Sequence, residues 1–314
     1  MSQEPRPIAV VAPRLLGHPS DYVTRGLLAA LGSLGVPTIP VPRSLGTVLA
    51  KGPIPVPLRR RRPILVPMMG GRFDLLYAAA LRGTPVPFAW DVWEPDWTTW
   101  VRKLKPLRLP LILVTAEISA AFMREQLAPA QVVCMPEATT PSNYDPGPDL
   151  GRRSIDVFEM GRRHPAWHEA ITEPARRAGL VHRYPSQPGE PLFGTEAELR
   201  AGFADSRISV CFPASVTTPS RAGSVATMTH RYLESVASRC LILGQAPAEL
   251  VSLLGFDPVI EADERDPWGQ LQRLLAEIER HQALVDEAHE RLPAVASWET
   301  RARQILARVA ASFA

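Results

Sequence analysis

The sequence predicts an α/β fold made of two doubly wound domains. Apolar runs of strand length alternate along the chain with segments of helical periodicity, the pattern of parallel sheets covered by helices. A turn-rich segment with several prolines and glycines, Pro136 to Asp149, divides this alternation into two halves. The length of 314 residues suits two medium domains. We therefore expect one domain in residues 1–145 and a second in residues 146–296.

The first half opens with a strand, a helix and a second strand. Ile8 to Ala12 is a continuous apolar run, as expected of a parallel strand buried on both faces. Asp21 to Leu34 carries leucines on one side and ends before Gly35, which predicts a helix, and Val36 to Val41 follows as a short strand. Further strands are expected at Ile64 to Met68, Val86 to Trp90, Leu109 to Thr115 and Val132 to Met135, and helices at Phe73 to Leu81 and Glu117 to Leu127.

The second half repeats the same rhythm. Strands are expected at Ile155 to Glu159, Leu180 to Tyr184, Arg207 to Phe212, Cys240 to Leu243 and Val259 to Glu261. Helices are expected at Pro165 to Arg177 and Thr229 to Ser238. From Asp266 the chain is almost wholly helical, and we expect Pro293 to divide it into Pro267 to Leu292 and a last helix near Trp298 to Ala311.

Composition places the chain among ordinary globular proteins. Hydrophobic residues make up 46% and charged residues 21%, which is normal for a protein that buries a core. The formal net charge of +3 is too small to indicate a nucleic-acid partner. The cysteines, Cys134, Cys211 and Cys240, lie in apolar runs without metal-ligand spacing, which indicates free buried thiols and a reducing compartment.

The sequence shows no pattern of a targeting signal or a membrane span. The N-terminus is polar before its first strand, so it does not read as a signal peptide, and the apolar runs are too short to span a bilayer. We expect a cytoplasmic protein with no nucleic-acid partner and no stable membrane insertion. A homodimer is compatible with the sequence.

The stretch from Thr217 to Leu250 predicts a seat for a phosphate group. A small-residue loop runs into the helix expected from Thr229, and such a helix start offers free backbone N–H groups and the positive end of a dipole. The side-chain hydroxyls of serine and threonine and the positive charge of an arginine add to these donors. The candidate phosphate contacts are Arg221, Gly223, Ser224, Thr227 and Thr229.

Glu234 lies about one helical turn beyond this seat. A carboxylate there can reach the two hydroxyls of a ribose while the loop holds the phosphates, which is the layout of a nucleotide-binding α/β domain. The alternative is an ordinary loop, helix and strand with Glu234 in solvent, since Gly/Ser loops are common.

A cluster of tryptophans marks the first half. Trp90, Trp93, Trp97 and Trp100 lie close together, and the last three share a face if the segment is helical. They form either a packed aromatic face or the lining of a site for an acceptor substrate, since aromatic faces suit sugars and other flat or apolar rings. With Lys103, Lys105 and Arg108 beside them, a membrane-surface patch is the least favoured interpretation.

Candidate residues for acceptor chemistry surround these tryptophans. Asp91 and Glu94 follow a predicted strand, where the carboxyl edge of a parallel sheet receives ligands. We expect one of the two to orient or deprotonate the acceptor. His18, in the loop after the first strand, joins Trp90 and Trp93 as an expected acceptor contact.

Several other chemistries lack their residues. His164 and His168 have the spacing of a metal-binding pair on a helix, but no third ligand lies near them in the sequence, so we expect no metal site. GxSxG, P-loop, HExxH and GxGxxG motifs are absent, which argues against hydrolase, NTPase, zinc-protease and nicotinamide enzymes.

Two segments resemble a known family. Thr229 to Gly244 is similar to the T-x-R-x-x-E-A-x-A-x-G-x-x-x-x-G segment of bacterial glycosyltransferases with the GT-B fold, nearest to the "glycosyl transferases group 1" type with its CgeB-like branch. Ser154 to Arg162 resembles the strand and Gly-Arg that open their donor domain. The resemblance implies that Glu234 holds the donor ribose, that the loop before it holds the diphosphate, and that Arg162 also contacts the diphosphate.

The resemblance also implies an architecture and a reaction. Two Rossmann-like domains face across a cleft, the first for the acceptor and the second for the donor, hinged near Thr140 to Asp149, with 297–314 packing back on the first. The turn Ser186 to Gly189 would hold the base. The implied activity is transfer of a hexose from a nucleoside-diphosphate sugar, UDP-sugar favoured, to a small-molecule hydroxyl or amine. It would be metal-independent, retaining and without a cofactor, with Arg162 as a catalytic contact.

Some positions depart from the family pattern. Ala226 stands where members carry a sugar-contacting glutamate, Trp167 and His168 stand where a lysine is common, and Asp91 stands where many have a histidine. We expect the nucleotide site to be kept and the sugar contacts to be altered. The alternatives are therefore a nucleotide-sugar epimerase of the same fold and a non-catalytic nucleotide-sugar-binding partner subunit.

Overall fold

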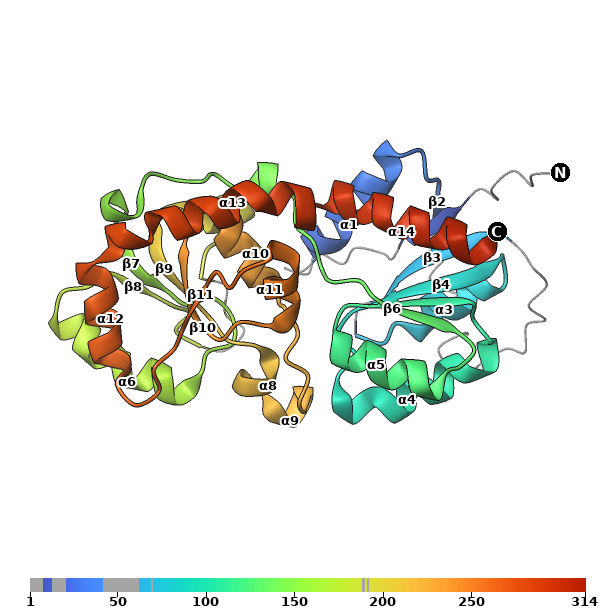
Figure 1. Ribbon diagram of the computed structural model, residues 1–314, viewed down its shortest axis with the longest axis horizontal. Helices are drawn as coiled ribbons and strands as arrows, with labels where there is room; N and C mark the ends of the chain where they lie inside the picture. The colour runs from blue at the N-terminus through green and yellow to red at the C-terminus, as the bar shows by residue number, and fades with distance from the viewer. Residues whose placement is uncertain (1–7, 13–20, 42–61, 69, 188–189, 191) are drawn as a thin grey trace. The chain divides into compact units, whose positions relative to one another are not determined.

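The computed structural model describes residues 8–12, 21–41, 62–68, 70–187, 190 and 192–314 (Figure 1). Contacts divide the chain into two compact units: unit 1, Met1–Pro136 with Trp298–Ala314, and unit 2, Glu137–Ser297. The division falls after Pro136, earlier than the expected boundary at residue 145. The segment that follows Pro136 groups with unit 2 because its side chains bond there, as Tyr144 does to Glu234.

Unit 1 is built on a six-stranded parallel sheet in the order β2-β1-β3-β4-β5-β6. Its strands are β1 (Ala9–Ala12), β2 (Thr38–Pro40), β3 (Pro63–Met68), β4 (Thr84–Ala89), β5 (Leu111–Val114) and β6 (Gln131–Cys134). Its helices include α1 (Asp21–Ser33), α3 (Phe73–Ala80), α4 (Trp97–Leu104), α5 (Glu117–Gln126) and α14 (Trp298–Phe313). The central strands β3 and β4 are buried along their whole length, as their apolar sequences predict.

Prolines are tolerated in the middle of this sheet for a geometric reason. The N–H of Thr84 donates to the backbone carbonyl of Arg62, just before β3. On the other side, the carbonyl of Ala89 accepts from the N–H of Thr115, just after β5. The backbone nitrogens of Pro85 and Pro87 therefore face β5, and the β4–β5 pairing begins only at Phe88. Their missing N–H groups fall where no ladder forms.

Unit 2 is built on a five-stranded parallel sheet in the order β11-β10-β9-β7-β8. Its strands are β7 (Ile155–Phe158), β8 (His182–Arg183), β9 (Ser206–Cys211), β10 (Leu241–Gly244) and β11 (Val259–Glu261). Its longer helices are α6 (Pro165–Arg177), α7 (Glu196–Ala204), α10 (His230–Ala237), α11 (Ala248–Leu254), α12 (Pro267–Ala276) and α13 (Gln282–Ala296). The prediction of two doubly wound sheets is confirmed.

The helical C-terminus differs from its prediction in one respect. Pro293 does not end a helix but lies inside α13, and the break before α14 comes at Ser297, whose backbone is extended. A proline removes one helical hydrogen bond, yet Leu292 and Ala296 on either side are buried against α10. This packing outweighs the lost bond. The expected single helix Pro267 to Leu292 is instead divided by a 3-10 turn at Ile278–His281.

The last helix returns to the first unit, as predicted. Within unit 1, α14 packs against α1. Its inward face includes Ala302, Ile305 and Val309, all buried. Among the described residues, no helix combines the length and apolarity that a membrane crossing requires.

Candidate functional site

Two segments of unit 2 that are far apart in sequence meet at the start of α10. Gly161 and Arg162 form a turn after β7, with Gly161 at φ 76°. Arg231, the second residue of α10, donates from Nη1 to the carbonyl of Arg162 at 3.0 Å, across a separation of 69 residues. A Cβ on Gly161 would lie 3.1 Å from Nη2 of Arg231. The fold thus joins the Gly-Arg turn to the first turn of the helix.

The segment before α10 contains regular secondary structure. Two short helical turns, α8 (Ala214–Thr217) and α9 (Pro219–Ala222), precede it. Gly223 ends α9 at φ 60° and ψ −135°, a conformation that favours glycine. Arg221 and Ser224 on either side of this glycine are exposed.

Two threonines of this segment carry buried hydroxyls. Thr229 is the residue before α10, but its side chain does not cap the helix. The hydroxyls of Thr227 and Thr229 are buried and have no hydrogen-bond partner among the described residues. Buried hydroxyls are nearly always satisfied, and backbone N–H groups at a helix start attract anions. Thr227 and Thr229 therefore stay candidate contacts for a ligand with acceptor oxygens.

Glu234 lies one turn further along α10 and is 1% exposed. The alternative that placed this carboxylate in solvent is therefore wrong. The phenol of Tyr144 donates to its Oε1 at 2.9 Å. Burial and the charge of Glu234 raise the pKa of Tyr144, so the phenol remains a donor at every ordinary pH. A ribose at Glu234 would share the carboxylate with Tyr144.

His230 begins α10 as a neutral imidazole. Burial lowers its pKa from 6.5 to about 3. Its Nε2 lies 3.5 Å from the hydroxyl of Thr139, and Nδ1 lies 4.0 Å from a carboxylate oxygen of Glu137. A neutral ring at the positive end of a helix avoids repulsion with the dipole.

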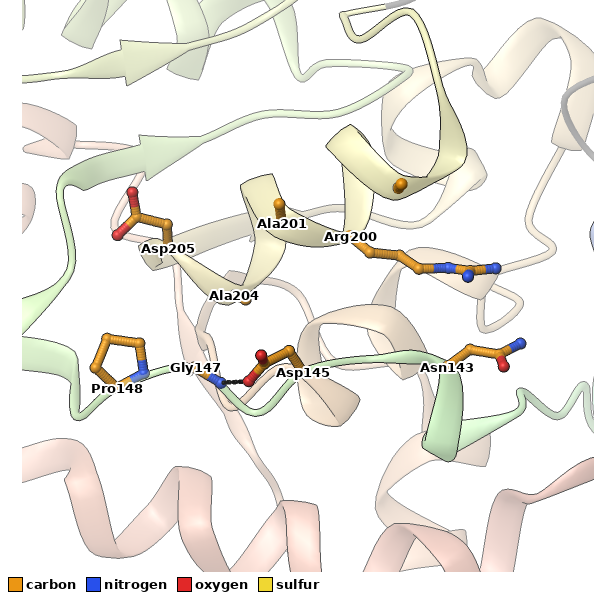
Figure 2. Close-up of a pocket in the computed structure, with 9 residues that line it drawn as sticks. Asn143, Asp145, Gly147, Pro148, Arg200, Ala201, Ala204 and Asp205 are labelled. Carbon is orange, nitrogen blue, oxygen red and sulfur yellow. Dashed lines mark hydrogen bonds between the residues drawn. The ribbon is translucent and has the colours of Figure 1, made fainter.

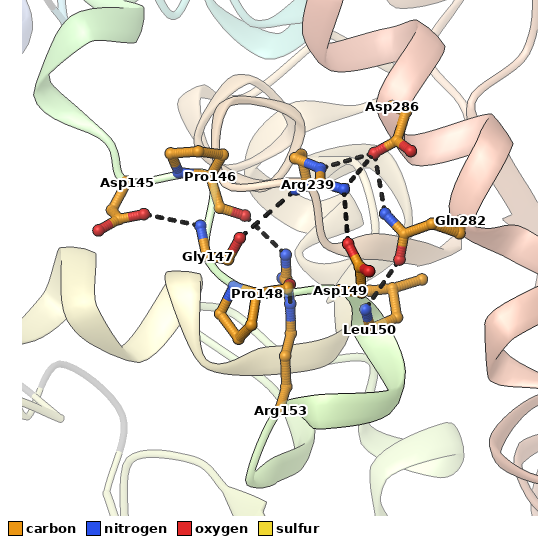
Figure 3. A network of polar contacts seen from close by, with 10 residues as sticks. All are labelled: Asp145, Pro146, Gly147, Pro148, Asp149, Leu150, Arg153, Arg239, Gln282 and Asp286. Carbon is orange, nitrogen blue, oxygen red and sulfur yellow. Dashed lines mark hydrogen bonds and ion pairs between the residues drawn. The ribbon is translucent and has the colours of Figure 1, made fainter.

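The segment expected to be the hinge is anchored in unit 2 by two arginines (Figure 3). Arg153, 1% exposed, donates to the carbonyls of Pro146 at 2.7 Å, Pro148 at 2.9 Å and Ser206 at 2.8 Å. Arg239 contacts Asp149 and Asp286. The chain from Tyr144 to Arg153 is thus bonded to α10, β9 and α13.

A pocket of about 730 Å³ lies beside this segment (Figure 2). Asn143, Asp145, Arg200 and Asp205 supply its polar lining, and α7 contributes alanines. Asp205 directly precedes β9, so the pocket lies toward the amino end of the strands. Ligands of open parallel sheets bind at the carboxyl end. We therefore do not place a nucleotide in this pocket.

In unit 1, Asp91 lies two residues beyond Ala89, the last residue of the central strand β4. It is half-buried and has φ 54°, a left-handed conformation that is uncommon for a residue other than glycine. Such conformations cluster at functional sites. Glu94, the first residue of a 3-10 turn (Glu94–Asp96), is exposed. His18 lies outside the described residues.

The tryptophans are part of the unit 1 core. Trp90, Trp93 and Trp100 are only 2–3% exposed, and the Trp90 ring lies 4.2 Å from that of Phe88 between centroids. Trp97 stacks on Phe122 at 4.5 Å. In this structure Trp90 and Trp93 offer almost no surface to an acceptor. The packed aromatic face, the alternative to an acceptor lining, describes them better.

The histidines of unit 2 do not pair as their spacing suggested. His164 caps α6, accepting from the backbone N–H of Trp167 at 3.2 Å. His168 instead contacts Glu159 at 2.8 Å, and His182 contacts the same carboxylate oxygen at 2.7 Å. The third group absent near His168 in sequence is supplied by β8, which lies beside β7 in the sheet.

Two side chains of the candidate site, Arg231 and Tyr144, are not among the residues predicted from the sequence. Arg231 stands at the arginine of the T-x-R-x-x-E segment, so the pattern itself contained the signal. Tyr144 is a lone aromatic within a proline-rich connection, and only the fold shows that it reaches Glu234.

No protein-family model matches the sequence, and no curated protein matches it. Solved structures do match. A structure named "Trehalose-6-phosphate from E. coli bound with UDP-2-fluoro glucose" has a TM-score of 0.60 at 12% identity, over 96% of this chain and 98% of that chain. AviGT4, a glycosyltransferase involved in Avilamycin A biosynthesis, has a TM-score of 0.58 at 13% identity, over 98% of both chains. A UDP-N-acetylglucosamine 2-epimerase has a TM-score of 0.51 at 11% identity, over 95% of this chain and 94% of that chain.

At these identities the likeness establishes the fold. The chain has the two-domain α/β architecture shared by these enzymes, and that architecture is GT-B. The predicted fold class is confirmed, whereas the CgeB-like branch stays a prediction.

Proposed function

We propose that this protein is a glycosyltransferase that moves a hexose from a nucleoside-diphosphate sugar, a UDP-sugar by preference, to a small-molecule acceptor. In this proposal unit 2 binds the donor and unit 1 provides the acceptor side. The reaction proceeds without a metal at the diphosphate and with retention, as the sequence resemblance implies.

The observation that carries the proposal is the bond between Arg231 and the Gly161–Arg162 turn. It brings two separately predicted phosphate-binding segments to the same helix start. There Arg162, Arg221 and Arg231 would oppose the charge that develops on the leaving diphosphate, and the N–H groups of α10 would donate to it. Stabilising that leaving group is the main service a protein can offer without a metal ion.

The nucleoside would bind along α10. The seat holds the diphosphate with Gly223, Ser224, Thr227 and Thr229, and Glu234 accepts from the ribose hydroxyls. Tyr144 supports this role because its hydrogen bond orients the carboxylate. Ribose hydroxyls then contact a group whose position is already held, which lowers the ordering cost of binding.

On the acceptor side, Asp91 is the stronger candidate for orienting or deprotonating the nucleophile. It sits at the carboxyl end of a central strand with a strained backbone, whereas Glu94 is exposed. A carboxylate in this place can accept the proton of a hydroxyl or amine. Asp91→Asn should therefore lower the turnover number and leave donor binding unchanged.

The test is a panel of nucleoside-diphosphate sugars incubated with the protein, with free UDP, GDP and dTDP measured. Slow nucleotide release that an acceptor accelerates supports a transferase. Interconversion of two donor sugars would instead identify an epimerase. Binding without turnover would identify a non-catalytic subunit, an outcome that Ala226, in place of a sugar-contacting glutamate, would accommodate.

The ribose assignment has its own test. Glu234→Gln should weaken donor binding by about 1.5–3 kcal/mol, roughly 10- to 150-fold in Kd, the worth of hydrogen bonds to a charged group. Glu249→Gln is a matched control, because Glu249 is a buried carboxylate of unit 2 on α11. Equal affinity in the two variants would contradict the assignment.

A further inference from the structure

Three chemistry-bearing side chains of unit 2 converge at the carboxyl end of β7. Glu159 directly follows β7, His168 lies in α6, and His182 lies in β8. The side chain of Glu159 is 2% exposed, and those of His168 and His182 are 15% and 5% exposed. Three separate elements thus place two imidazoles and a carboxylate in one largely buried cluster.

We propose that Glu159, His168 and His182 form a binding site for one divalent transition-metal ion, with Zn²⁺ as the preferred ion. Two histidines and one carboxylate are a donor set that zinc takes in proteins. One ligand atom from each residue lies within 4.8 Å of the others. Tetrahedral ligation at about 2.0–2.1 Å separates ligand atoms by roughly 3.4 Å. The two ring nitrogens lie 2.8 and 2.7 Å from the Glu159 carboxylate oxygen, so they need to move apart from it only slightly to reach that separation.

The charge of the cluster favours a cation. The Oε1 atom of Glu159 lies 2.8 Å from Nδ1 of His168 and 2.7 Å from Nε2 of His182, so the carboxylate and both ring nitrogens face one point. A carboxylate that is 2% exposed is costly to bury as an anion, and a divalent ion would compensate its charge directly.

Metal binding would require a proton to move within the His168 ring, because the contact with Arg163 sets the present tautomer. Its guanidinium can only donate, and Nη1 lies 3.0 Å from Nε2 of His168. That nitrogen therefore accepts, and Nδ1–H donates to Glu159. A metal on Nδ1 moves the proton to Nε2, where the hydroxyl of Thr172 at 3.4 Å can accept it and Arg163 cannot.

The other groups allow this exchange. Arg163 can leave His168 and keep its contact with the Tyr184 ring, whose centroid lies 5.3 Å away. The Nδ1 of His182 is buried without a hydrogen bond to any described residue, so no second partner fixes its tautomer. The arginine thus opposes the metal, and removing it should strengthen binding.

The ion would cross-link β7, α6 and β8 just before the Gly161–Arg162 turn. The site does not depend on the proposed transferase activity, because its ligands are separate from the residues assigned to the donor. Its test is a measurement of metal binding, so its failure would leave the transferase proposal standing.

The experiment titrates the chelator-treated full chain with Zn²⁺ in competition with a chromophoric chelator, and with Co²⁺ followed by visible absorption. We expect one ion per chain and the intense absorption of tetrahedral Co²⁺. His168→Ala and His182→Ala should each weaken binding at least about 100-fold, and Arg163→Gln should tighten it roughly 10-fold. His281→Ala, outside the cluster, should match the wild type.

Folding of the variants is checked by circular dichroism, and Glu159→Gln provides a conservative replacement of the buried ligand. It should abolish the Co²⁺ absorption without loss of secondary structure. The proposal is overturned if the wild type gives no tetrahedral Co²⁺ spectrum. It is equally overturned if His281→Ala reduces Zn²⁺ binding while His182→Ala does not, since surface histidines would then hold the ion.

Discussion

Replacing Tyr144 with phenylalanine removes a single hydroxyl, the one that donates to Glu234 in the candidate donor site. Tyr144 is 7% exposed and Glu234 is 1% exposed, so water cannot readily replace the 2.9 Å hydrogen bond between them. A hydrogen bond to a charged group contributes about 1.5–3 kcal/mol. We expect Tyr144→Phe to lower the free energy of unfolding of unit 2 by that amount. We also expect it to weaken donor binding, because the carboxylate loses its orientation.

Urea denaturation would measure the loss, and hydrogen exchange of the α10 amides would locate it. Tyr184→Phe is the matched control, since the Tyr184 hydroxyl has no hydrogen bond to a described residue and should cost almost nothing. In the Glu234→Gln background the same Tyr144→Phe change should cost less, because the acceptor is then neutral. A loss below about 0.5 kcal/mol in the wild-type background would refute the reasoning.

Three further predictions concern unit 2. Arg231→Met removes the bond to the Arg162 carbonyl and a charge, so the thermal shift produced by UDP should shrink, with Kd rising roughly 10-fold or more. His230 binds a proton near pH 6.5 in the unfolded chain and only near pH 3 in the fold, so lowering the pH favours unfolding. Its share of the free energy of unfolding falls by about 1.5 kcal/mol from pH 6.5 to about pH 5, and urea titrations of His230→Asn should lack it. Gly244→Ala would place a Cβ 1.8 Å from the Cys211 carbonyl at φ 152°, and calorimetry should show a loss of about 3 kcal/mol or more.

Each of these has a control of the same chemical type. Arg273→Met removes an exposed arginine of α12 and should leave the UDP shift unchanged. His281→Asn should keep the acid sensitivity assigned to His230. Gly32→Ala lies in α1, where an added Cβ meets nothing within 4 Å, and should not destabilise the protein. Indistinguishable results from a variant and its control would reject the corresponding prediction.

The sheets were predictable because parallel strands are buried on both faces. Val157 and Leu243 lie in short apolar runs bounded by turns, and such runs fit few other structures. The helix containing Pro293 was mispredicted because packing on α10 overrides a local preference. Periodicity also could not decide whether the tryptophans face the core or a ligand. Burial of Trp90 and Trp100 decides it in favour of the core.

The candidate site was predictable where its residues share one local segment. Thr229 and Glu234 belong to one loop and helix, so their spacing alone suggested a nucleotide seat. The meeting of His182 with Glu159 depends on β8 lying beside β7, and strand order cannot be read from a strand's own sequence. The same holds for Tyr144, whose partner is 90 residues away.

Arg153 has a practical consequence for dissecting the protein. Its guanidinium gathers carbonyls from both sides of Gly147, so the stretch before β7 is part of what must fold with that strand. A fragment that began at Leu150 would leave this buried cation without two of its acceptors and Glu234 without its phenol. An isolated second unit should therefore begin at Glu137, the first residue that groups with it.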